Sequence, residues 1–204
     1  MKSKYIAFLL LFLVSLGLDQ STKIWARQTL KPANYPNAIS APKTVIKGYW
    51  DFRYSENPGS AFGMFRNQAG ARYFLFGIGI VCLGVIGLWL YRLPPNAKWL
   101  GVKLGLLAGG AIGNMVDRAM YSRVTDFILW KITTSSTTYE WPTFNVADAA
   151  LVIGVGMILI DRPRDPLPPP WFWRGLAQKK GDRQYRTRCH KRRACKIGLC
   201  RKCG

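Results

Sequence analysis

Three aspartates in the second half of the chain are the side chains best suited to chemistry. Asp117 and Asp126 lie in the stretch GNMVDRAMYSRVTDFI, and Asp148 follows in FNVADAAL. The single histidine, His190, is near the end of the sequence, so a serine, histidine and aspartate triad is excluded. No cluster of histidine or cysteine accompanies the aspartates, which argues against a metal site there. Paired carboxyl groups remain, and they need neither a metal nor a cofactor.

Paired carboxyl groups divide the work of an acid and a base. Two such groups held close together cannot both ionise easily, so one of them keeps its proton. The ionised group can then take a proton from water, while the neutral group donates a hydrogen bond to a carbonyl and makes it electrophilic. This is the chemistry of aspartic proteases.

Four apolar runs supply the elements that must position these aspartates. The chain has 204 residues, of which 49% are hydrophobic, and a net charge of +20. With its polar end included, each run reaches the roughly 20 residues that a helix needs to cross a bilayer. We therefore predict four transmembrane helices, at residues 5–18 (continuing to residue 26), 73–91, 99–112 and 144–160.

The first apolar run could alternatively be a cleaved signal peptide, because the basic start MKSK precedes it. No small-x-small cleavage site closes the run, however, and the helical pattern continues through DQSTKIWA. We therefore expect this segment to remain as a membrane helix.

Basic residues at the ends of the runs predict the orientation in the membrane. Lys2 and Lys4 precede the first run, and Arg92 and Lys98 lie between the second and the third. A strongly basic tail follows the fourth. The positive-inside rule places these three segments in the cytoplasm, and the loops at residues 28–70 and about 120–143 outside.

The polar residues of the membrane part then gather on the outer side. Some share a helical face, since three of them follow each other at i, i+3 and i+4 and two at i and i+3. Ionisable groups at membrane depth are costly unless they are paired or face a cavity. We expect them to form one wall of a polar pocket: Asp19, Asn57, Asn114, Asp117, Arg118, Asn145 and Asp148.

The first outer loop predicts a small sheet. In YWDFRYSENPGSAFGMF, aromatic and polar residues alternate with the period of a half-exposed strand, and Asn57-Pro58-Gly59 is a turn signal. The later stretch TTSSTTYEW is polar and carries no recognisable motif. The expected fold class is an all-α membrane protein with four transmembrane helices and a small extracytoplasmic β-platform between the first two. Such a platform could guide an extended peptide.

Five motifs taken in order resemble bacterial lipoprotein signal peptidase, also called signal peptidase II. They are LDQSTK, ENPGSAFG, GGAIGNMVDR, RVTDFI and FNVADAAL. The resemblance runs over roughly residues 4–160. The resemblance implies a membrane-embedded aspartic endopeptidase without a cofactor. Its substrate would be a diacylglyceryl-modified prolipoprotein, cut just before the lipidated cysteine.

The resemblance also implies roles for individual residues. The catalytic pair of the family falls on Asp126, in TDF, and Asp148, in NVAD. Asp117 would orient its neighbours or form an ion pair with Arg118. The residues that would support the site or bind substrate are Asp19, Lys23, Asn57, Gly59, Asn114, Asp117, Arg118, Asn145 and Ala147.

Structural roles remain open for several of these residues. Asp19 and Lys23, at i and i+4, could form only an ion pair within one helix. Asn57 could serve only the turn before Pro58. The glycines of GLLAGGAIG favour close packing of helices.

A small proton- or cation-coupled transporter is the alternative function, because four helices with membrane-embedded carboxylates would suit it. A transporter site belongs near the middle of the bilayer, however, whereas these acids gather at one face. A non-catalytic scaffold would explain neither the asparagines nor the second carboxylate.

The predicted domains are a four-helix membrane peptidase domain at residues 1–160 and a basic, Pro- and Cys-rich cytoplasmic tail at residues 161–204. More than half of the net charge lies in this tail, which we expect to be disordered and attracted to anionic headgroups. Nucleic acid is a less expected anionic partner. We expect a monomer in the bacterial inner membrane. A zinc site in the tail is an alternative to free thiols, with ligands among Cys189, His190, Cys195, Cys200 and Cys203.

Overall fold

The computed structural model describes residues 3–35, 40–58 and 71–160, which belong to one compact unit. The predicted tail at residues 161–204 lies outside the described residues, and so do the zinc ligands proposed within it. Gly59 also lies outside them.

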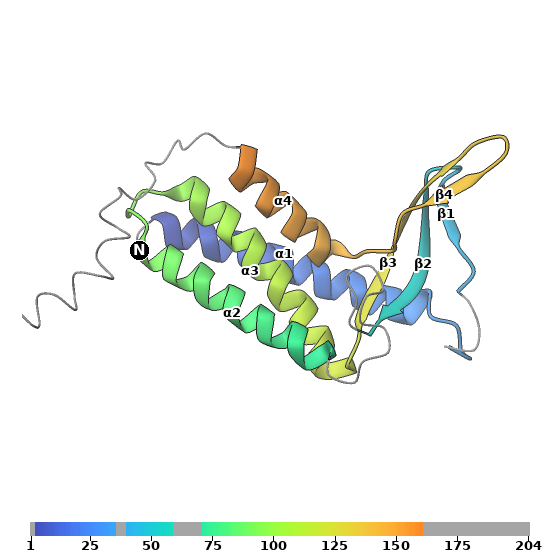
Figure 1. Cartoon of the computed structure of the whole chain (residues 1–204), viewed down its shortest axis with the longest axis horizontal. Coiled ribbons are helices and arrows are strands. Elements are labelled where there is room, and N and C mark those ends of the chain that lie inside the picture. The colour runs from blue at the N-terminus through green and yellow to red at the C-terminus, as the bar shows by residue number, and fades with distance from the viewer. Residues whose placement is uncertain (1–2, 36–39, 59–70, 161–204) are drawn as a thin grey trace, which may run out of the picture. The chain divides into compact units, whose positions relative to one another are not determined.

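The helices run side by side in Figure 1, three of them longer than the predicted apolar runs and the last beginning two residues after its predicted start. They are α1 (Ser3–Thr29), α2 (Ala71–Arg92), α3 (Lys98–Tyr121) and α4 (Val146–Ile160). By length and composition, α1, α2 and α3 can cross a membrane. The described part of α4 has only 15 residues, or roughly 22 Å at 1.5 Å per residue, and so falls short of the hydrocarbon core. The structure thus provides three spanning helices and one shorter apolar helix among the described residues, where four spans were predicted.

The helix α3 lies at the centre of the bundle, where it packs against α1, α2 and α4. Of the most apolar 18 residues of α3, 56% are buried, whereas in the corresponding stretch of α2 only 6% are buried. The exposed side chains of α2 are nevertheless large and apolar, including Phe74, Val81 and Val85. Such a surface suits contact with lipid chains rather than water.

Glycines on α3 allow its backbone to approach α1 closely. A Cβ atom added to Gly101 would lie 2.5 Å from the carbonyl oxygen of Lys4, and one added to Gly105 would lie 2.5 Å from that of Phe8. These distances are too short for any side chain, so the two helices meet backbone to backbone. The predicted role of the glycine-rich run in helix packing is confirmed here.

The basic flank at the start of α1 has a structural use besides its charge. The Lys4 side chain is only 2% exposed. Its Nζ donates hydrogen bonds to the carbonyl oxygens of Leu90, Tyr91 and Leu93, at 2.7, 3.0 and 2.5 Å. A cation at the carboxyl end of α2 satisfies carbonyls that have no partner within the helix.

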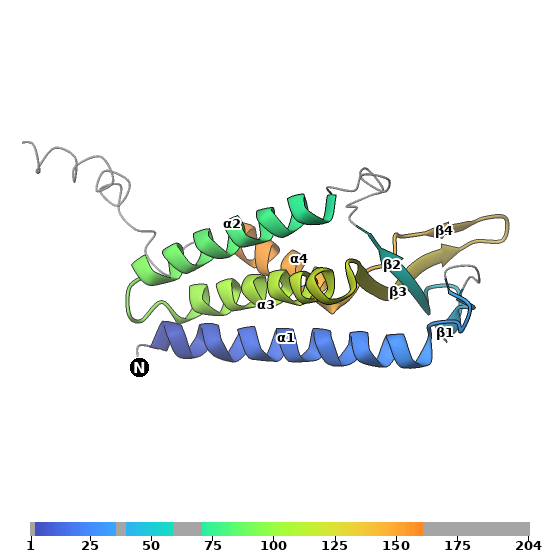
Figure 2. The same ribbon diagram turned by 90° about the horizontal axis from the view of Figure 1, so that it is seen from below.

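A four-stranded antiparallel sheet lies at the end of the bundle where α1 and α3 finish (Figures 1 and 2). Its order is β1-β2-β3-β4, with β1 at Lys43–Ile46, β2 at Trp50–Asn57, β3 at Val124–Thr133 and β4 at Thr138–Glu140. Only β1 and β2 come from the loop between α1 and α2. The platform predicted between α1 and α2 is therefore present only in part, since the loop between α3 and α4 supplies the other two strands.

The apparently featureless stretch TTSSTTYEW is the turn and second strand of a hairpin. Thr133 pairs with Thr138, and the amide of Thr134 donates to the carbonyl oxygen of Thr137 at 2.8 Å. A polar turn and an exposed three-residue strand carry little apolar alternation, which is why the sequence pattern did not reveal them.

Aromatic side chains hold the sheet against the outer part of α1. A buried cluster joins Ala26 and Leu30 to Tyr54 of β2 and Phe127 of β3. The ring of Trp25 on α1 adds an edge contact with Phe52, at 5.0 Å between centroids. Edge-to-face pairs of this kind add to the burial of apolar area. The sheet is therefore fixed to α1, which also carries polar residues of the predicted site.

Candidate active site

The two predicted catalytic aspartates are joined by a pair of asparagines. Asp126 lies on β3, and Asp148 lies in the first turn of α4. The Nδ2 of Asn145 donates to Oδ1 of Asp126 at 2.6 Å, and the Nδ2 of Asn114 donates to Oδ1 of Asp148 at 2.8 Å. The Nδ2 of Asn145 also lies 3.2 Å from Oδ1 of Asn114. Three separate elements thus bring the two carboxyl groups into one hydrogen-bonded cluster.

Asn145 reaches this cluster from a helix cap. It precedes the first residue of α4, and its Oδ1 accepts a hydrogen bond from the amide of Asp148 at 3.0 Å. The carboxylate of Asp148 in turn accepts from the amide of Asn145 at 3.3 Å. This reciprocal pair is a capping box, which satisfies amides that the helix leaves without partners. The i and i+3 spacing therefore marks a helix start and not, as expected, two residues on one helical face.

Burial and a neighbouring charge act on Asp126 in the same direction. Its residue surface is 3% exposed. Burial, followed by repulsion from Asp148, raises the pKa of the Asp126 carboxyl to about 8, although the hydrogen bond from Asn145 opposes this shift. At neutral pH Asp126 therefore holds a proton, while Asp148 is partly accessible at the mouth of the helix cap. An acid and a base of this kind are what water activation requires.

The raised pKa makes stability depend on pH. A carboxyl group with a pKa of about 8 in the folded state and an ordinary value of 3.8 when unfolded stabilises the fold fully below pH 4. This contribution is lost as the pH rises towards 8, and it amounts to roughly 6 kcal/mol at most. Asp126→Asn should therefore melt at a higher temperature than the wild type at pH 8 and above, with a difference that shrinks towards pH 4. Melting curves of both proteins in detergent check this, and parallel pH profiles would contradict it.

A second buried network lies beside the aspartate pair and centres on Lys23 of α1. Its Nζ lies 2.9 Å from Oδ2 of Asp19 and 3.6 Å from Oδ2 of Asp117, and all three side chains are fully buried. It also donates to Oδ1 of Asn114 at 2.9 Å, the same asparagine that contacts Asp148. The ion pair predicted within α1 is thus confirmed, and it belongs to a larger network that touches the candidate site.

Asp19 connects this network to α4. Its Oδ1 accepts a hydrogen bond from the backbone amide of Ala147 at 2.9 Å. Ala147 is itself fully buried. A carboxylate near the amino end of a helix is favoured both by the free amides and by the helix dipole. Asp19 and Ala147 therefore fix where α4 begins, and with it the position of Asp148.

Asp117 pairs with α1 and not, as predicted, with Arg118. Its Oδ1 lies 3.3 Å from Nη1 of Arg27, and its Oδ2 accepts from the amide of Thr125 at 2.9 Å. Nη1 of Arg118 instead donates to the carbonyl oxygen of Asn114 at 3.1 Å. Consecutive residues on a helix point about 100° apart, so the two side chains face different neighbours.

Arg27 and Thr125 contribute to the site and were missed in the sequence. The Nη1 of Arg27 also donates to Oγ1 of Thr125 at 2.9 Å. Arg27 follows Asp19 and Lys23 at steps of four residues, so the helical spacing could have revealed it. Nothing in the local pattern singles out Thr125, because its role depends on the neighbouring Asp126 and on the approach of α3.

Asn57 lies at the end of β2, where it pairs in register with Val124 at the start of β3. Asn57 therefore lies opposite a residue of β3 that precedes Asp126 by two positions. The residue predicted to act with it, Gly59, lies outside the described residues.

Among the described residues, no group of three or more histidine, cysteine or acidic side chains could hold a metal ion.

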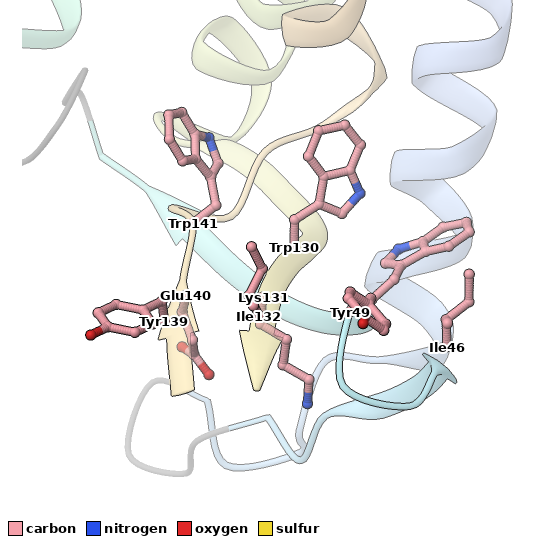
Figure 3. Close-up of a pocket in the computed structure, with 9 residues that line it drawn as sticks. Ile46, Tyr49, Trp130, Lys131, Ile132, Tyr139, Glu140 and Trp141 are labelled. Carbon is pink, nitrogen blue, oxygen red and sulfur yellow. The ribbon is translucent and has the colours of Figure 1, made fainter. Parts of the chain in front are cut away.

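A separate groove of about 530 Å³ opens on the distal part of the sheet (Figure 3). Its lining is mostly aromatic and includes Trp130 and Trp141. Its two charged residues already have partners in the protein, since Lys131 pairs with Asp51 and Glu140 pairs with Arg53. The groove contains none of the predicted catalytic or supporting residues.

A bundle of membrane-length helices with a small sheet over a buried polar cluster is the architecture of a membrane enzyme. The chain is similar to a bacterial membrane enzyme solved by the in meso method at 1.9 Å resolution, with a TM-score of 0.63 and 30% identity over 78% of this chain and 93% of that one. A second structure of this description, at 2.3 Å resolution, gives a TM-score of 0.62 with 30% identity, covering 75% of this chain and 85% of that one.

The family model described as signal peptidase (SPase) II matches residues 11–163, so the chain belongs to the signal peptidase II family and is a membrane peptidase. It is similar to the lipoprotein signal peptidase of Xylella fastidiosa strain M12, at 35% identity over 79% of this chain and 93% of the relative. The corresponding protein of Geobacter metallireducens is 34% identical over 81% of this chain and 95% of its own length. The lipoprotein signal peptidase of Pseudomonas putida is 37% identical over 76% of this chain and 86% of its own length. The resemblance found in the five motifs is confirmed, and the transporter alternative receives no support.

Proposed function

We propose that this protein is an aspartic endopeptidase that removes signal peptides from diacylglyceryl-modified prolipoproteins, cutting before the lipidated cysteine. The family match and the names of the relatives support the substrate class. The observation that carries the aspartic mechanism is the cluster in which Asn114 and Asn145 join the carboxyl groups of Asp126 and Asp148.

In the proposed reaction, Asp148 is the base and Asp126 is the acid. The ionised carboxylate of Asp148 takes a proton from water, whose oxygen attacks the carbon of the scissile carbonyl. The neutral carboxyl of Asp126 donates its proton to the carbonyl oxygen, giving a tetrahedral diol. The carbon–nitrogen bond then breaks as a proton passes to the leaving nitrogen. The products are a peptide with a new carboxyl end and a lipidated cysteine with a free amino group. The raised pKa of Asp126 favours this assignment over the reverse one.

The remaining predicted residues would support this pair. Asp19 and Ala147 would set the start of α4, and Lys23 would hold Asn114 against Asp148. Asp117 would hold the start of β3 through Thr125. Arg118 contributes a positive charge near both aspartates. Asn57, at the end of β2, and Gly59 would contact substrate.

We further propose that the protein lies in the bacterial inner membrane with both termini in the cytoplasm and its active site at the outer face. In this arrangement the chain crosses the membrane four times. The basic flanks Lys4, Arg92 and Lys98 support the orientation. The tail at residues 161–204 would rest on anionic headgroups, and the working form would be a monomer.

A gel-shift assay tests the function directly. The purified protein in detergent is incubated with a prolipoprotein that carries the diacylglyceryl group and, in parallel, with the same protein without the lipid. We expect cleavage of the lipidated form only, since the enzyme would recognise the modified cysteine. Equal cleavage of both forms would overturn the substrate assignment. If the folded protein cleaves neither form but carries ions into vesicles, the peptidase proposal fails and the transporter alternative returns.

A further inference from the structure

The strand β2 contains an irregularity just before it reaches Asp126. Phe52 pairs with Ile128, but the next register pair is Ser55 with Asp126. The chain thus advances three residues on β2 and only two on β3, so that β2 carries one extra residue opposite Phe127. A bulge of this kind bends its strand and redirects the side chains around it. The position of Asp126 beside Asp148 therefore depends on what holds the end of β2 after the bulge.

Glu56 is the residue that holds this end. It pairs in register with Thr125, the neighbour of Asp126. Its Oε1 accepts hydrogen bonds from Nζ of Lys31 at 2.9 Å and from the hydroxyl of Tyr54 at 2.8 Å. Its Oε2 accepts from Nη1 of Arg123 at 3.0 Å. One carboxylate thus connects the segment after α1, the bulged part of β2 and the residue just before β3.

The charge state of this cluster matches its role. The side chain of Glu56 is 13% exposed. Burial alone would raise the pKa of Glu56, but hydrogen bonds from Lys31, Tyr54 and Arg123 outweigh it and lower the pKa below its ordinary value. Burial, together with the hydrogen bond to Glu56, raises the pKa of Tyr54, which keeps its phenol as a donor. Glu56 is therefore an ionised acceptor at neutral pH.

The start of β3 is consequently held from two sides. Asp117 on α3 binds the amide of Thr125 from the membrane side, and Glu56 binds Arg123 from β2. Only two residues separate Arg123 from Asp126. A shift of about 1 Å in a catalytic group can cost a hundredfold in rate, so a contact this close to Asp126 bears on catalysis.

We propose that Glu56 is a positioning residue for Asp126: by bridging Lys31 and Arg123 it keeps the bulged end of β2 in the register that sets Asp126 beside Asp148. The inference rests on the proposed function, because it assumes that Asp126 reacts. Neither the predicted catalytic pair nor the predicted supporting residues include Glu56.

The chain offers a matched control in the same sheet. Glu140 pairs with Arg53 at 2.9 Å, the same kind of ion pair at nearly the same distance. It connects β4 to Arg53, which lies within the bulged stretch of β2, and it pairs with none of the site residues. Both of its side chains are more exposed, at 30% for Arg53 and 42% for Glu140. Exposed pairs of this kind contribute roughly 1 kcal/mol or less to stability.

The test compares Glu56→Gln with Glu140→Gln on the lipidated prolipoprotein. We expect Glu56→Gln to lower kcat about tenfold while KM changes less than twofold, because the substrate surface is intact but Asp126 is misplaced. Glu140→Gln should change neither constant. The values of kcat are referred to the folded fraction of each protein, measured by size exclusion and thermal unfolding, so that a simple loss of folded enzyme does not count.

The partner of Glu56 provides the rescue. Arg123→Gln should reproduce the tenfold loss, and Arg123→Lys, which keeps a cation in reach, should retain most of the activity. If Glu56→Gln equals Glu140→Gln, or if its loss vanishes once the folded fraction is counted, Glu56 is not a positioning residue. Asp126→Asn distinguishes failure of the proposed function from failure of this inference. If Asp126→Asn remains active, the proposed function is overturned. If Asp126→Asn is inactive but Glu56→Gln is fully active, only this inference is overturned.

Discussion

Replacing Asp148 by asparagine should abolish cleavage, with kcat reduced at least about a thousandfold. Asparagine keeps the shape of the side chain, and its Oδ1 can still accept the hydrogen bond from Asn114 that Asp148 now receives at 2.8 Å. It cannot, however, take a proton from water. We expect Asp126→Asn to be as inactive, because the amide cannot give a proton to the carbonyl oxygen. The gel-shift assay on lipidated prolipoprotein measures both.

Asp51→Asn is the matched control for these two variants. Asp51 is also a buried aspartate of the sheet, 1% exposed and paired with Lys131, but it lies away from the aspartate pair. Its replacement should leave kcat within about twofold, as expected for a group with no part in proton transfer. If Asp148→Asn cleaved at a rate near that of the wild type, Asp148 would lose its catalytic assignment.

The largest effect on stability is expected for Lys23→Met. This change leaves the fully buried carboxylates of Asp19 and Asp117 without their shared cation, while methionine fills a similar volume. Removing one partner of a buried ion pair typically costs about 3–5 kcal/mol, since the remaining charge stays buried. We therefore expect the melting temperature in detergent to fall by roughly 10 °C. Activity should fall as well, because Lys23 also holds Asn114.

Two further variants identify the cause of this loss. Combining Lys23→Met with Asp19→Asn should restore part of the lost melting temperature, because one of the buried carboxylates left without a cation is then replaced by a neutral amide. Arg53→Gln breaks an exposed ion pair and should change the melting temperature by no more than a degree or two. A Lys23→Met protein that melts like the wild type would show that the buried network contributes little to the fold.

The helices could be predicted because lipid and water impose a strong pattern on composition. The apolar runs gave α1, α2 and α3 nearly in full, and the charges of GNMVDRAMYSRVTDFI were correctly read as belonging to the polar end of α3 and the segment that follows. The spacing of Asp19 and Lys23 predicted their ion pair. Each of these features is local in the sequence, so that a few neighbouring residues suffice to specify it.

The features that escaped prediction depend on contacts between distant segments. The hairpin of β3 and β4 was missed because its edge strand is short and polar, and β3 pairs with β2 across two intervening helices. The partners of Asp117 are Arg27 and Thr125, which only the approach of α1 and β3 brings together. The roles of Asp126 and Asp148 came from the motifs of a family, since spacing alone could not show that two residues on different elements meet.

The composite sheet also limits when the strand of Asp126 can pair. Because β2 precedes α2 and β3 follows α3, the two strands can pair only after both helices have been inserted and the chain beyond them has emerged. Closing so long a loop has an entropic cost that only the late contacts offset. Until then a nascent chain holds Asp126 on an unpaired strand. The sheet that carries Asp126 therefore forms late in the biogenesis of the protein.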